Sequence, residues 1–428
     1  MQSFNAQTQD WVSLSQELNG DVLDMVVYQG KLIACGTFTV SEPTVLRNIA
    51  AWDGIQWTNL GKGIKSNNVN SIAVVHRMLI FNNELYAVGR FDSAGTIASK
   101  NVAKWDGTNW ISLTNFVNNQ ILSITAYNNE VYIGGRFDAM ETISPSRIAK
   151  YDGNNWQSIG SGISSLGDFV RDFYSFNSQL YMSGSFPGAG GINTNNVAIW
   201  DGTSWHGITN NTIGGTAMIE WNGKLLFSNT NTVIQDIQQW DGINWSMFSS
   251  QHNMCYINKF YIFNNKLYCA GYNIPPGSDD NSVIYSWDQG SQIWSKVGTG
   301  VNGTVLGLCE YNGELYCSGV FKKSTGANHN YIAKLSTVTG LAKSAPSKVS
   351  VNVFPNPVKD KLNLEFAGNE TGDLSLSMIN ALGQTVLNSK IEIHNFNSIL
   401  DLSCLQSGVY YLKIENDKTN RVLKLIKE

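Results

Sequence analysis

The sequence predicts an all-β protein whose larger part is built from repeated four-stranded units. Three short patterns recur in a fixed order between residues 10 and 337, the segments between them carry the residues of tight hairpin turns, and one copy of a pattern stands by itself near the N-terminus. The 428 residues are too many for one ordinary compact domain. A repeat architecture accommodates such a length because each added unit extends the core.

The first pattern is a strand that typically carries a Leu-Tyr pair and ends in Gly-x-Phe. Its seven copies begin at Lys31, Glu84, Glu130, Gln179, Lys224, Lys266 and Glu314. One further apolar run precedes each copy, and the clear cases begin at Val22, Ile121, Ala217 and Val305. These two segments predict the first two strands of every unit.

The second pattern places an aromatic residue before Asp-Gly, and the third is a Trp that opens a short strand. Copies of the second begin at Asn48, Asn101, Arg147, Asn196, Asp236 and Val283, with a truncated copy at Tyr331. Copies of the third follow at Trp57, Trp110, Trp156, Trp205, Trp245 and Trp294. The seventh Trp strand, Trp11 to Leu14, precedes every other pattern.

The turns between these segments can be assigned from their residue types. Asn-Gly and Asn-Asn pairs, as at Asn312 and Asn128, supply the positive φ of two-residue hairpins and connect strands one and two. Asp-Gly, first at Asp53, turns strand three into strand four. Gly61-x-Gly63 and its two counterparts fall between units, so we interpret them as turns and not as phosphate loops. Each unit is therefore an antiparallel meander of four strands.

A meander of this size has two apolar faces, so the units are expected to pack face to face around an axis. Their spacing of roughly 40 to 50 residues is that of propeller blades. We therefore predict a seven-bladed β-propeller over residues 10–337. The last unit lacks its Trp strand, and donation of Trp11 to Leu14 would close the ring and remove its open edges.

Composition excludes several partners. Charged residues make up 14% of the chain, and the net charge of -4 comes without any block of Lys or Arg, so neither nucleic acid nor an anionic membrane is an expected partner. No apolar run of about 20 residues predicts a transmembrane helix. Residues 1–9 are either the remnant of a signal peptide, since Phe4 to Gln7 resembles the end of one, or a disordered start.

The six cysteines are even in number, which permits disulfides in an exported protein. Five of them lie inside apolar strand-like runs, where Cys commonly acts as a small buried hydrophobic residue. We expect free structural thiols. No CxxC pair indicates a zinc site.

The repeats resemble those of kelch-type propellers and of the Trp-Asp-Gly repeats in fungal cortical polarity proteins. The aromatic-Asp-Gly-x-x-Trp pattern and the Gly134-Gly135 pair before Phe137 carry this resemblance over residues 10–337. It implies the fold more than a function, because such families include adaptors, surface proteins and a few enzymes. Blades five and six depart from the pattern and are expected to be locally irregular.

Residues 338–349 are polar and predict a linker, and residues 350–428 follow a different pattern. This segment resembles the type A C-terminal sorting domain of type IX secretion in Bacteroidetes, and alternation in its strands predicts a small β-sandwich. The motif residues that carry the resemblance are Pro355, Asn356, Pro357, Gly383, Gly408, Tyr410, Lys424, Leu425 and Lys427. The resemblance implies the type IX machinery as a partner, export across the outer membrane, and a location that is secreted or on the cell surface.

No catalytic, metal or cofactor site is predicted. The five His residues are scattered without ligand spacing, and no Gly-x-Ser-x-Gly elbow or P-loop occurs. The carboxylate pairs Asp279-Asp280 and Asp168 with Asp172 could bind calcium or act in acid-base chemistry, although such surface pairs are commonly just solvated.

A repeated Gly-Arg-Phe-Asp motif indicates a candidate ligand site. It places Arg90 with Asp92 and Arg136 with Asp138, at the roots of the variable loops that follow the second strand of blades two and three. The arginines could face an anionic group such as a uronic acid, or each Arg-Asp pair could brace its own loop. The leading hypothesis is a propeller that binds an extracellular glycan or protein, and the alternative is a secreted carbohydrate-active or other degradative enzyme.

Overall fold

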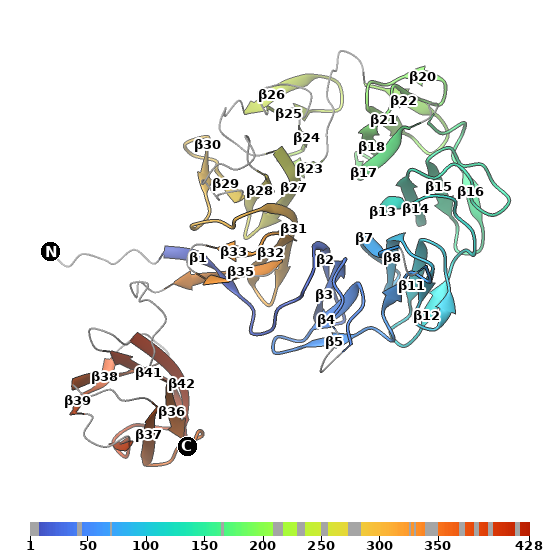
Figure 1. Ribbon diagram of the computed structural model, residues 1–428. Helices are drawn as coiled ribbons and strands as arrows, with labels where there is room; N and C mark the ends of the chain where they lie inside the picture. Colours follow the sequence, from blue (N-terminus) through green and yellow to red (C-terminus); the bar gives the residue numbers. More distant parts are fainter. Residues whose placement is uncertain are drawn as a thin grey trace. The chain divides into compact units, whose positions relative to one another are not determined.

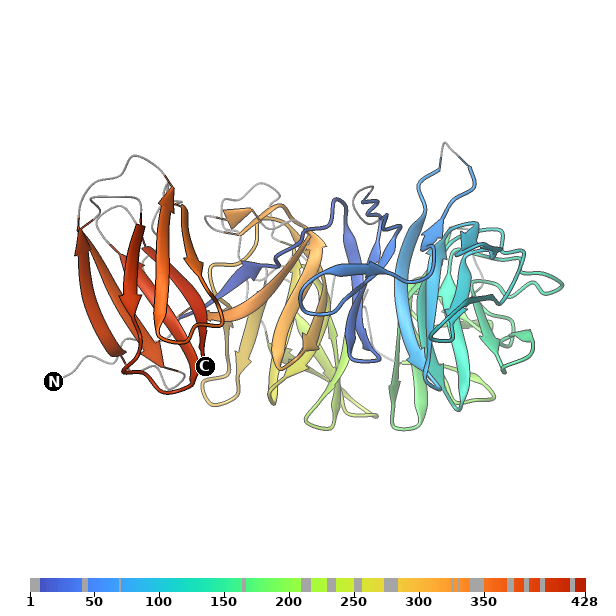
Figure 2. The ribbon, with the colours of Figure 1, turned by 90° about the horizontal axis from the view of Figure 1, so that it is seen from below.

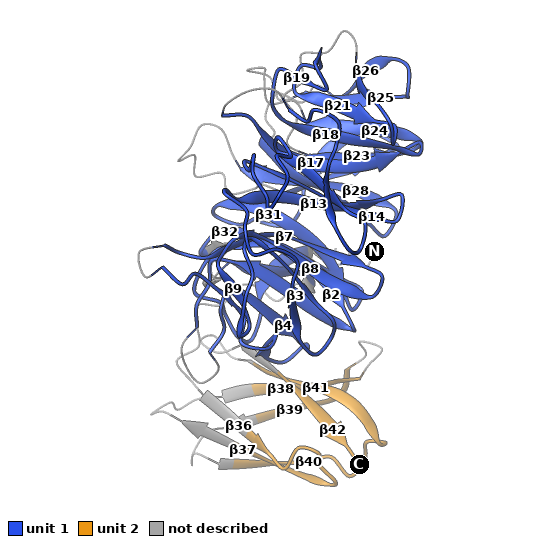
Figure 3. Cartoon of the chain, turned by 90° about the vertical axis from the view of Figure 1, so that its right-hand side faces the viewer, with its two compact units in different colours: residues 1–340 blue, residues 341–428 orange. Residues whose placement is uncertain are grey.

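We analysed a computed structural model of the whole chain. It describes residues 8–40, 45–68, 71–163, 167–208, 217–228, 236–249, 256–272, 284–324, 327–328, 331–338, 350–367, 373–380, 385–392, 397–415 and 420–428. The chain divides into two compact units, Met1–Gly340 and Leu341–Glu428 (Figure 3). The expected linker falls almost wholly outside the described residues.

Both units are all-β. Among the described residues, unit 1 holds seven four-stranded antiparallel sheets. The first three are β2 (Val22–Tyr28), β3 (Lys31–Gly36), β4 (Ile49–Trp52) and β5 (Trp57–Asn59); β7 (Val74–Phe81), β8 (Glu84–Arg90), β11 (Val102–Trp105) and β12 (Trp110–Ser112); and β13 (Ile121–Tyr127), β14 (Glu130–Gly135), β15 (Ile148–Tyr151) and β16 (Trp156–Ser158).

The next three sheets repeat the same order. They are β17 (Phe169–Phe176), β18 (Gln179–Ser185), β21 (Val197–Trp200) and β22 (Trp205–Gly207); β23 (Met218–Trp221), β24 (Lys224–Ser228), β25 (Ile237–Trp240) and β26 (Trp245–Ser249); and β27 (Tyr256–Phe263), β28 (Lys266–Tyr272), β29 (Ile284–Asp288) and β30 (Ile293–Lys296). Short ribbons extend the loops of some sheets: β6 (Ile64–Lys65), β9 (Ser93–Ala94) and β10 (Ile97–Ala98); β19 (Gly188–Ala189) and β20 (Ile192–Asn193); and β33 (Lys323–Ser324) and β34 (Ala327–Asn328).

The last sheet of unit 1 draws its strands from both ends of the unit. It consists of β31 (Thr304–Tyr311), β32 (Glu314–Val320), β35 (Ile332–Val338) and β1 (Thr8–Ser13). Strand β1 pairs antiparallel with β35, and Trp11 lies opposite Leu335. The sequence assigned this N-terminal strand to Trp11 to Leu14, whereas in the structure it begins at Thr8 and ends at Ser13.

The turn residues adopt the backbone conformations expected of them. Asn128 and Asn129, between β13 and β14, have φ of 48° and 61°, in the left-handed region that type I′ hairpin turns require. In the Asp-Gly turns the carboxylate orders the loop, since Asp106 Oδ1 accepts from the backbone N–H groups of Thr108 and Asn109 at 2.7 Å. Both glycines of the Gly61 and Gly63 turn also have positive φ.

The first strands of the seven sheets contact one another in succession, in the order β2, β7, β13, β17, β23, β27 and β31, and β31 also contacts β2. Figures 1 and 2 show these strands on the inner side of unit 1, with the second, third and fourth strands successively farther out. The loops that follow the second strands therefore lie at one end of the sheets, and the hairpins between first and second strands lie at the other.

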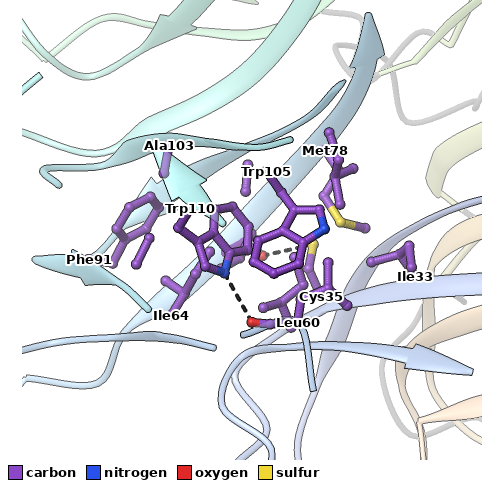
Figure 4. Close-up of a cluster of buried hydrophobic side chains, with 14 of the residues drawn as sticks. Ile33, Cys35, Leu60, Ile64, Met78, Phe91, Ala103, Trp105 and Trp110 are labelled. Atoms are coloured by element: carbon purple, nitrogen blue, oxygen red, sulfur yellow. Dashed lines mark hydrogen bonds between the residues drawn. The ribbon is translucent and has the colours of Figure 1, made fainter. Parts of the chain in front are cut away.

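Apolar side chains fill the space between neighbouring sheets. Figure 4 shows one such cluster, in which Cys35 and Ile33 of β3 meet Trp105 and Trp110 of the next sheet. Each aromatic ring of this size buries about 150–250 Å², so the regular placement of Trp accounts for much of the core.

A series of indole hydrogen bonds connects successive sheets along their outer strands. The Nε1–H groups donate to backbone carbonyls of the preceding sheet: Trp110 to Leu60 at 3.0 Å, Trp156 to Leu113 at 2.9 Å and Trp205 to Ile159 at 3.3 Å. Strand β1 takes part on both sides. Trp11 donates to Val297 at 2.9 Å, and the carbonyl of Gln16, just beyond β1, accepts from Trp57 at 3.2 Å.

The cysteines of unit 1 that the structure describes are buried. Cys35, Cys309 and Cys317 are free thiols, and burial raises the pKa of Cys309 to about 12. Such groups pack as small hydrophobic residues and are poor nucleophiles. Cys255 lies outside the described residues.

Unit 2 consists of two antiparallel sheets that share one buried cluster, which includes Val358, Leu376, Leu412 and Leu425. One sheet contains β36 (Ser350–Phe354), β37 (Lys361–Ala367) and β40 (Asn397–Asp401). The other contains β39 (Thr385–Glu392), β38 (Asp373–Asn380), β41 (Gly408–Glu415) and β42 (Asn420–Lys427).

Candidate binding site

The four predicted ligand residues lie at equivalent places in two neighbouring sheets. Arg90 is the last residue of β8, Arg136 follows the end of β14, and Asp92 and Asp138 come two residues later in each loop. Strands β7 and β13 of these two sheets are in contact. The structure therefore brings the four residues to the same end of adjacent sheets.

The aspartates bind partners other than the arginines of their motif. Asp92 forms an ion pair with Lys100 at 2.6 Å and accepts from Ser66 Oγ at 2.8 Å. Asp138 forms an ion pair with the buried Arg147 at 2.9 Å. Burial raises the pKa of Asp92, but the hydrogen bonds from Lys100 and Ser66 outweigh it and leave the pKa below its usual value. Within the described residues, no ion pair joins Arg90 to Asp92 or Arg136 to Asp138, so the Arg-Asp brace considered from the sequence does not form.

Among the described residues, neither Arg90 nor Arg136 forms an ion pair with a carboxylate. Arg90 donates to the carbonyl of Ile72 at 3.3 Å, and the guanidinium of Arg136 lies 4.2 Å from the ring centre of Phe169. A third arginine, Arg171 of β17, is exposed and forms no ion pair with any residue that the structure describes. Partial desolvation, followed by the charge of Arg77, lowers the pKa of Arg171, and Arg136 contributes to the same repulsion. Arg171 of sheet four thus lies within electrostatic range of Arg77 in sheet two and of Arg136 in sheet three.

A small cavity adjoins this group. It has a volume of about 230 Å³ and is lined by Arg90, Asp92, Lys100, Asn118 and Gln120 among other polar residues. His76 lies nearby and hydrogen-bonds to Gln120 at 3.2 Å. Burial lowers the pKa of His76 to about 4, so its imidazole is neutral at physiological pH and adds no charge.

A second, larger cavity lies among the first strands, on the inner side of the sheets. Its volume is about 630 Å³, and its lining extends from the middle of these strands to the hairpin residues Gly30 and Asn312. Four charged residues from four different sheets, Asp24, Arg77, Asp172 and Lys259, contribute to it, and Glu310 of β31 adds a third carboxylate. The sequence analysis did not identify this site, and it placed Asp172 only in a pair with Asp168.

A sequence signal for these four residues does exist. In the strands VLDMVVY, VVHRMLIF, FVRDFYSF and YINKFYIF, one charged residue stands at the same position, directly before an apolar residue. Comparison of the first strands across repeats would have revealed it.

Two of the carboxylates of this cavity hold backbone groups in place. Asp24 Oδ2 accepts from the Met78 N–H of the next sheet at 2.9 Å. Asp172 accepts in the same way from the N–H of Met218 and from its own neighbour Phe173. Burial raises the pKa of Asp172. The one His-carboxylate pair among the described residues joins His206 of β22 to Asp201, which follows β21, at 2.6 Å, and it lines neither cavity.

Metal binding has no visible basis in the described part of the chain, where no three His, Cys, Asp or Glu side chains gather to hold an ion. The pair Asp279-Asp280 lies outside the described residues. No helix among those that are described is long and apolar enough to span a membrane.

In unit 2 the motif residues converge on the last strand. Asn356 forms two hydrogen bonds to the backbone of β42: its Nδ2 donates to the carbonyl of Lys424, and its Oδ1 accepts from the N–H of Ile426, both at 2.9 Å. Leu425 and Lys427 are buried, whereas Lys424 is exposed. The hydroxyl of Tyr410 donates to Gln406 at 2.9 Å.

Three of the remaining motif residues lie next to these contacts in the chain or at the start of a strand. Pro355 and Pro357 flank Asn356, and Gly408 opens β41. Gly383 lies outside the described residues.

Residues 352–428 match the family model of the secretion system C-terminal sorting domain. The chain carries an export signal. This agrees with the resemblance to type IX sorting domains found in the sequence, and it means that type IX secretion handles the protein and delivers it out of the cell.

The other comparisons concern the whole chain. No curated protein matches it. A computationally designed protein named Ika8 is 12% identical, with 76% of this chain and 99% of that one covered and a TM-score of 0.47. A chain of the mitotic checkpoint complex is 14% identical, with 79% and 98% covered and a TM-score of 0.49.

Proposed function

We propose that this protein is exported by type IX secretion and acts outside the cell as a binding protein. Its binding part is a kelch-like, seven-bladed β-propeller, residues 10–337, closed by the N-terminal strand. A linker at residues 338–349 connects the propeller to the sorting domain, a small β-sandwich at residues 350–428.

Three observations support the closed propeller. Four-stranded sheets recur seven times in the described residues. Their first strands contact one another from β2 to β31, which contacts β2 again. The indole hydrogen bonds connect the N-terminal segment to both neighbouring sheets, since Trp11 donates to Val297 and Gln16 accepts from Trp57. Pairing of β1 with β35 completes the fourth strand of the last sheet, and it covers an edge that would otherwise promote association of a secreted protein.

The binding site that we propose for this propeller lies around Arg90, Arg136 and Arg171. The observation that supports it is the distribution of charge: Lys100 and Arg147 neutralise the aspartates of the loops, and in the part of the chain that the structure describes the three arginines form no ion pair with a carboxylate. Guanidinium groups bind carboxylates with two parallel hydrogen bonds. The site therefore suits a ligand with spaced carboxylates, such as a polymer of uronic acids.

The test uses the full chain and soluble polygalacturonate, with a neutral glucan as the comparison. We expect Arg90→Ala and Arg136→Ala each to weaken binding about ten-fold and the double variant to abolish it, since a hydrogen bond to a charged group contributes about 1.5–3 kcal/mol. Binding should also weaken with added salt. Lys31→Ala, at the exposed β2–β3 hairpin, serves as the charge-matched control.

Thermal unfolding of every variant separates binding from folding. Neither arginine forms an ion pair within the described residues, so the Tm should change by less than about 2 °C. Unchanged binding in the double variant, with or without a loss of stability, would contradict the proposed site.

A further inference from the structure

The larger cavity on the inner side of the sheets has a feature that the proposed polyanion site does not explain. Four charged side chains from sheets one, two, four and six, Asp24, Arg77, Asp172 and Lys259, line the same space of about 630 Å³. Two of these four are carboxylates and two are cations, and Glu310 of the seventh sheet adds a third carboxylate to the lining. Pockets for small ligands commonly have volumes of about 300–1,000 Å³.

A repeated backbone irregularity places these four residues. In β2, β7, β17 and β27 the register shifts by one residue, and the charged side chain is the first residue after the bulge. Bulges change the direction in which a strand presents its side chains, and they are common beside functional sites. In β13 and β31 the same position holds Ser123 and Gly307, so neither strand places a charge at this register, although Glu310 lines the cavity from farther along β31.

The opposite charges of the cavity do not pair with each other. Burial raises the pKa of Asp172, and the charges of Lys259 and Arg77 oppose that rise only in part. No ion pair joins any two of the four residues within the described part of the chain. The Nη1 group of Arg77 donates to the carbonyls of Leu23 at 3.2 Å and His76 at 3.0 Å.

Positive and negative side chains of the described residues therefore line the same cavity without forming ion pairs with one another. Partly desolvated charges are costly unless they are paired or hydrogen-bonded. A ligand that carries both signs would satisfy them together, with its carboxylate at Lys259 or Arg77 and its cation at Asp172 or Asp24. Between these groups, Met25, Met78, Phe173 and Leu308 offer apolar contacts.

We propose that this cavity binds a small zwitterion, a free amino acid or short peptide whose ammonium and carboxylate groups lie within one molecule. Lys259 holds the carboxylate and Asp172 holds the ammonium group. None of Arg90, Arg136 and Arg171 lines this cavity, so the two proposals rest on different residues and either can fail without the other.

The test measures binding of free amino acids, dipeptides and polygalacturonate to the full chain by titration calorimetry at constant pH. We expect at least one amino acid or dipeptide to bind saturably, and its N-acetylated and C-amidated forms to bind about ten-fold more weakly or not at all. If only free amino acids bind, the ligand is a free amino acid. If only dipeptides bind, the ligand is a short peptide.

Substitutions locate the site. Lys259→Gln and Asp172→Asn are each expected to weaken zwitterion binding about ten-fold or more, whereas Lys259→Arg should retain most of it. Lys266→Gln, at the exposed start of β28, and Arg136→Ala should leave it unchanged. Should Asp172→Asn fail to fold, because its carboxylate also holds Met218, the Lys259 variants carry the test alone.

Two results would overturn the proposal. One is the absence of binding by every free amino acid and dipeptide, which would mean that water alone solvates the four charges. The other is equal binding of the blocked and unblocked forms, or equal binding by Lys259→Gln.

Discussion

Deletion of residues 1–15 is expected to lower the melting temperature of the protein more than any single substitution outside β1. The deletion removes β1, which pairs with β35 along its whole length, and it removes Trp11, which is 2% exposed. Loss of a buried Trp side chain alone costs about 3–5 kcal/mol, which corresponds to a decrease in Tm of roughly 4–7 °C for a unit of this size. Loss of the strand adds to that.

The deletion also changes how the protein associates. Without β1, strand β35 presents unpaired N–H and C=O groups to solvent, and such an edge promotes pairing with another chain. We therefore expect the truncated protein to aggregate on heating, so that melting temperatures must be compared at one scan rate. Differential scanning calorimetry with light scattering measures both effects.

Single-residue variants separate the contributions of Trp11. Trp11→Phe keeps an aromatic ring but removes the hydrogen bond to Val297, and it should cost about 1 kcal/mol beyond the change in packing. Trp11→Ala should approach the effect of the deletion, and removal of residues 1–7 alone should have little effect. A truncation of residues 1–15 that melts with the full-length protein would show that β1 does not hold the ring together.

The strands and turns of unit 1 were predictable because their signals are local and repeated. Each strand is marked by alternating apolar and polar residues, and the Asn-rich and Asp-Gly turns lie within a few residues of it. Because the unit occurs seven times, an irregular copy can be assigned from the regular ones. The pairing of β1 with β35 is a long-range contact. It was predictable only because the repeats leave one strand missing at one end of the series and one in excess at the other.

The candidate site was less predictable because a side chain's partner depends on the tertiary structure. The motif places Arg90 two residues before Asp92, yet Asp92 pairs with Lys100 from the far side of the loop. Arg147 is a clearer example. Other repeats have Asn at this position, as at Asn48 and Asn101, and all three share a positive φ, so sequence comparison marks a turn and does not reveal that Arg147 neutralises Asp138.

The charged residues of the inner cavity were missed for a different reason. Each is a single polar residue in an apolar strand, which in one repeat suggests only a half-buried position. Asp24 and Lys259 indicate a site only when they are considered together, because bulges at the same register direct both side chains into one cavity. A bulge leaves no distinctive residue in these strands, so the sequence alone does not place it.

Removal of residues 424–428 is expected to abolish export and leave the protein in the periplasm. The matched family covers residues 352–428, so the truncation ends the sorting domain within its last strand. The structure adds a physical reason: Asn356 binds the backbone of Lys424 and Ile426, the N–H of Val358 donates to Ile426 at 2.8 Å, and Leu425 is 1% exposed. Loss of these contacts exposes part of the buried core of the domain to solvent.

Two sets of substitutions distinguish loss of the fold from loss of recognition. Leu425→Ala creates a cavity that should cost about 2–5 kcal/mol, and Asn356→Ala removes both hydrogen bonds to β42, so each should reduce export together with the stability of the domain. Lys424→Gln changes an exposed side chain and should leave stability unchanged. Lys390→Gln, exposed on β39, is its matched control.

The measurement is the fraction of full-length protein found outside the cell in a host with type IX secretion, alongside the thermal stability of each purified variant. If Lys424→Gln blocks export while Lys390→Gln does not, the machinery recognises the surface of β42 directly. If only Leu425→Ala and Asn356→Ala block it, the machinery requires the folded domain, because the defect then follows stability. Normal export after removal of residues 424–428 would contradict both mechanisms and would place the export signal outside β42.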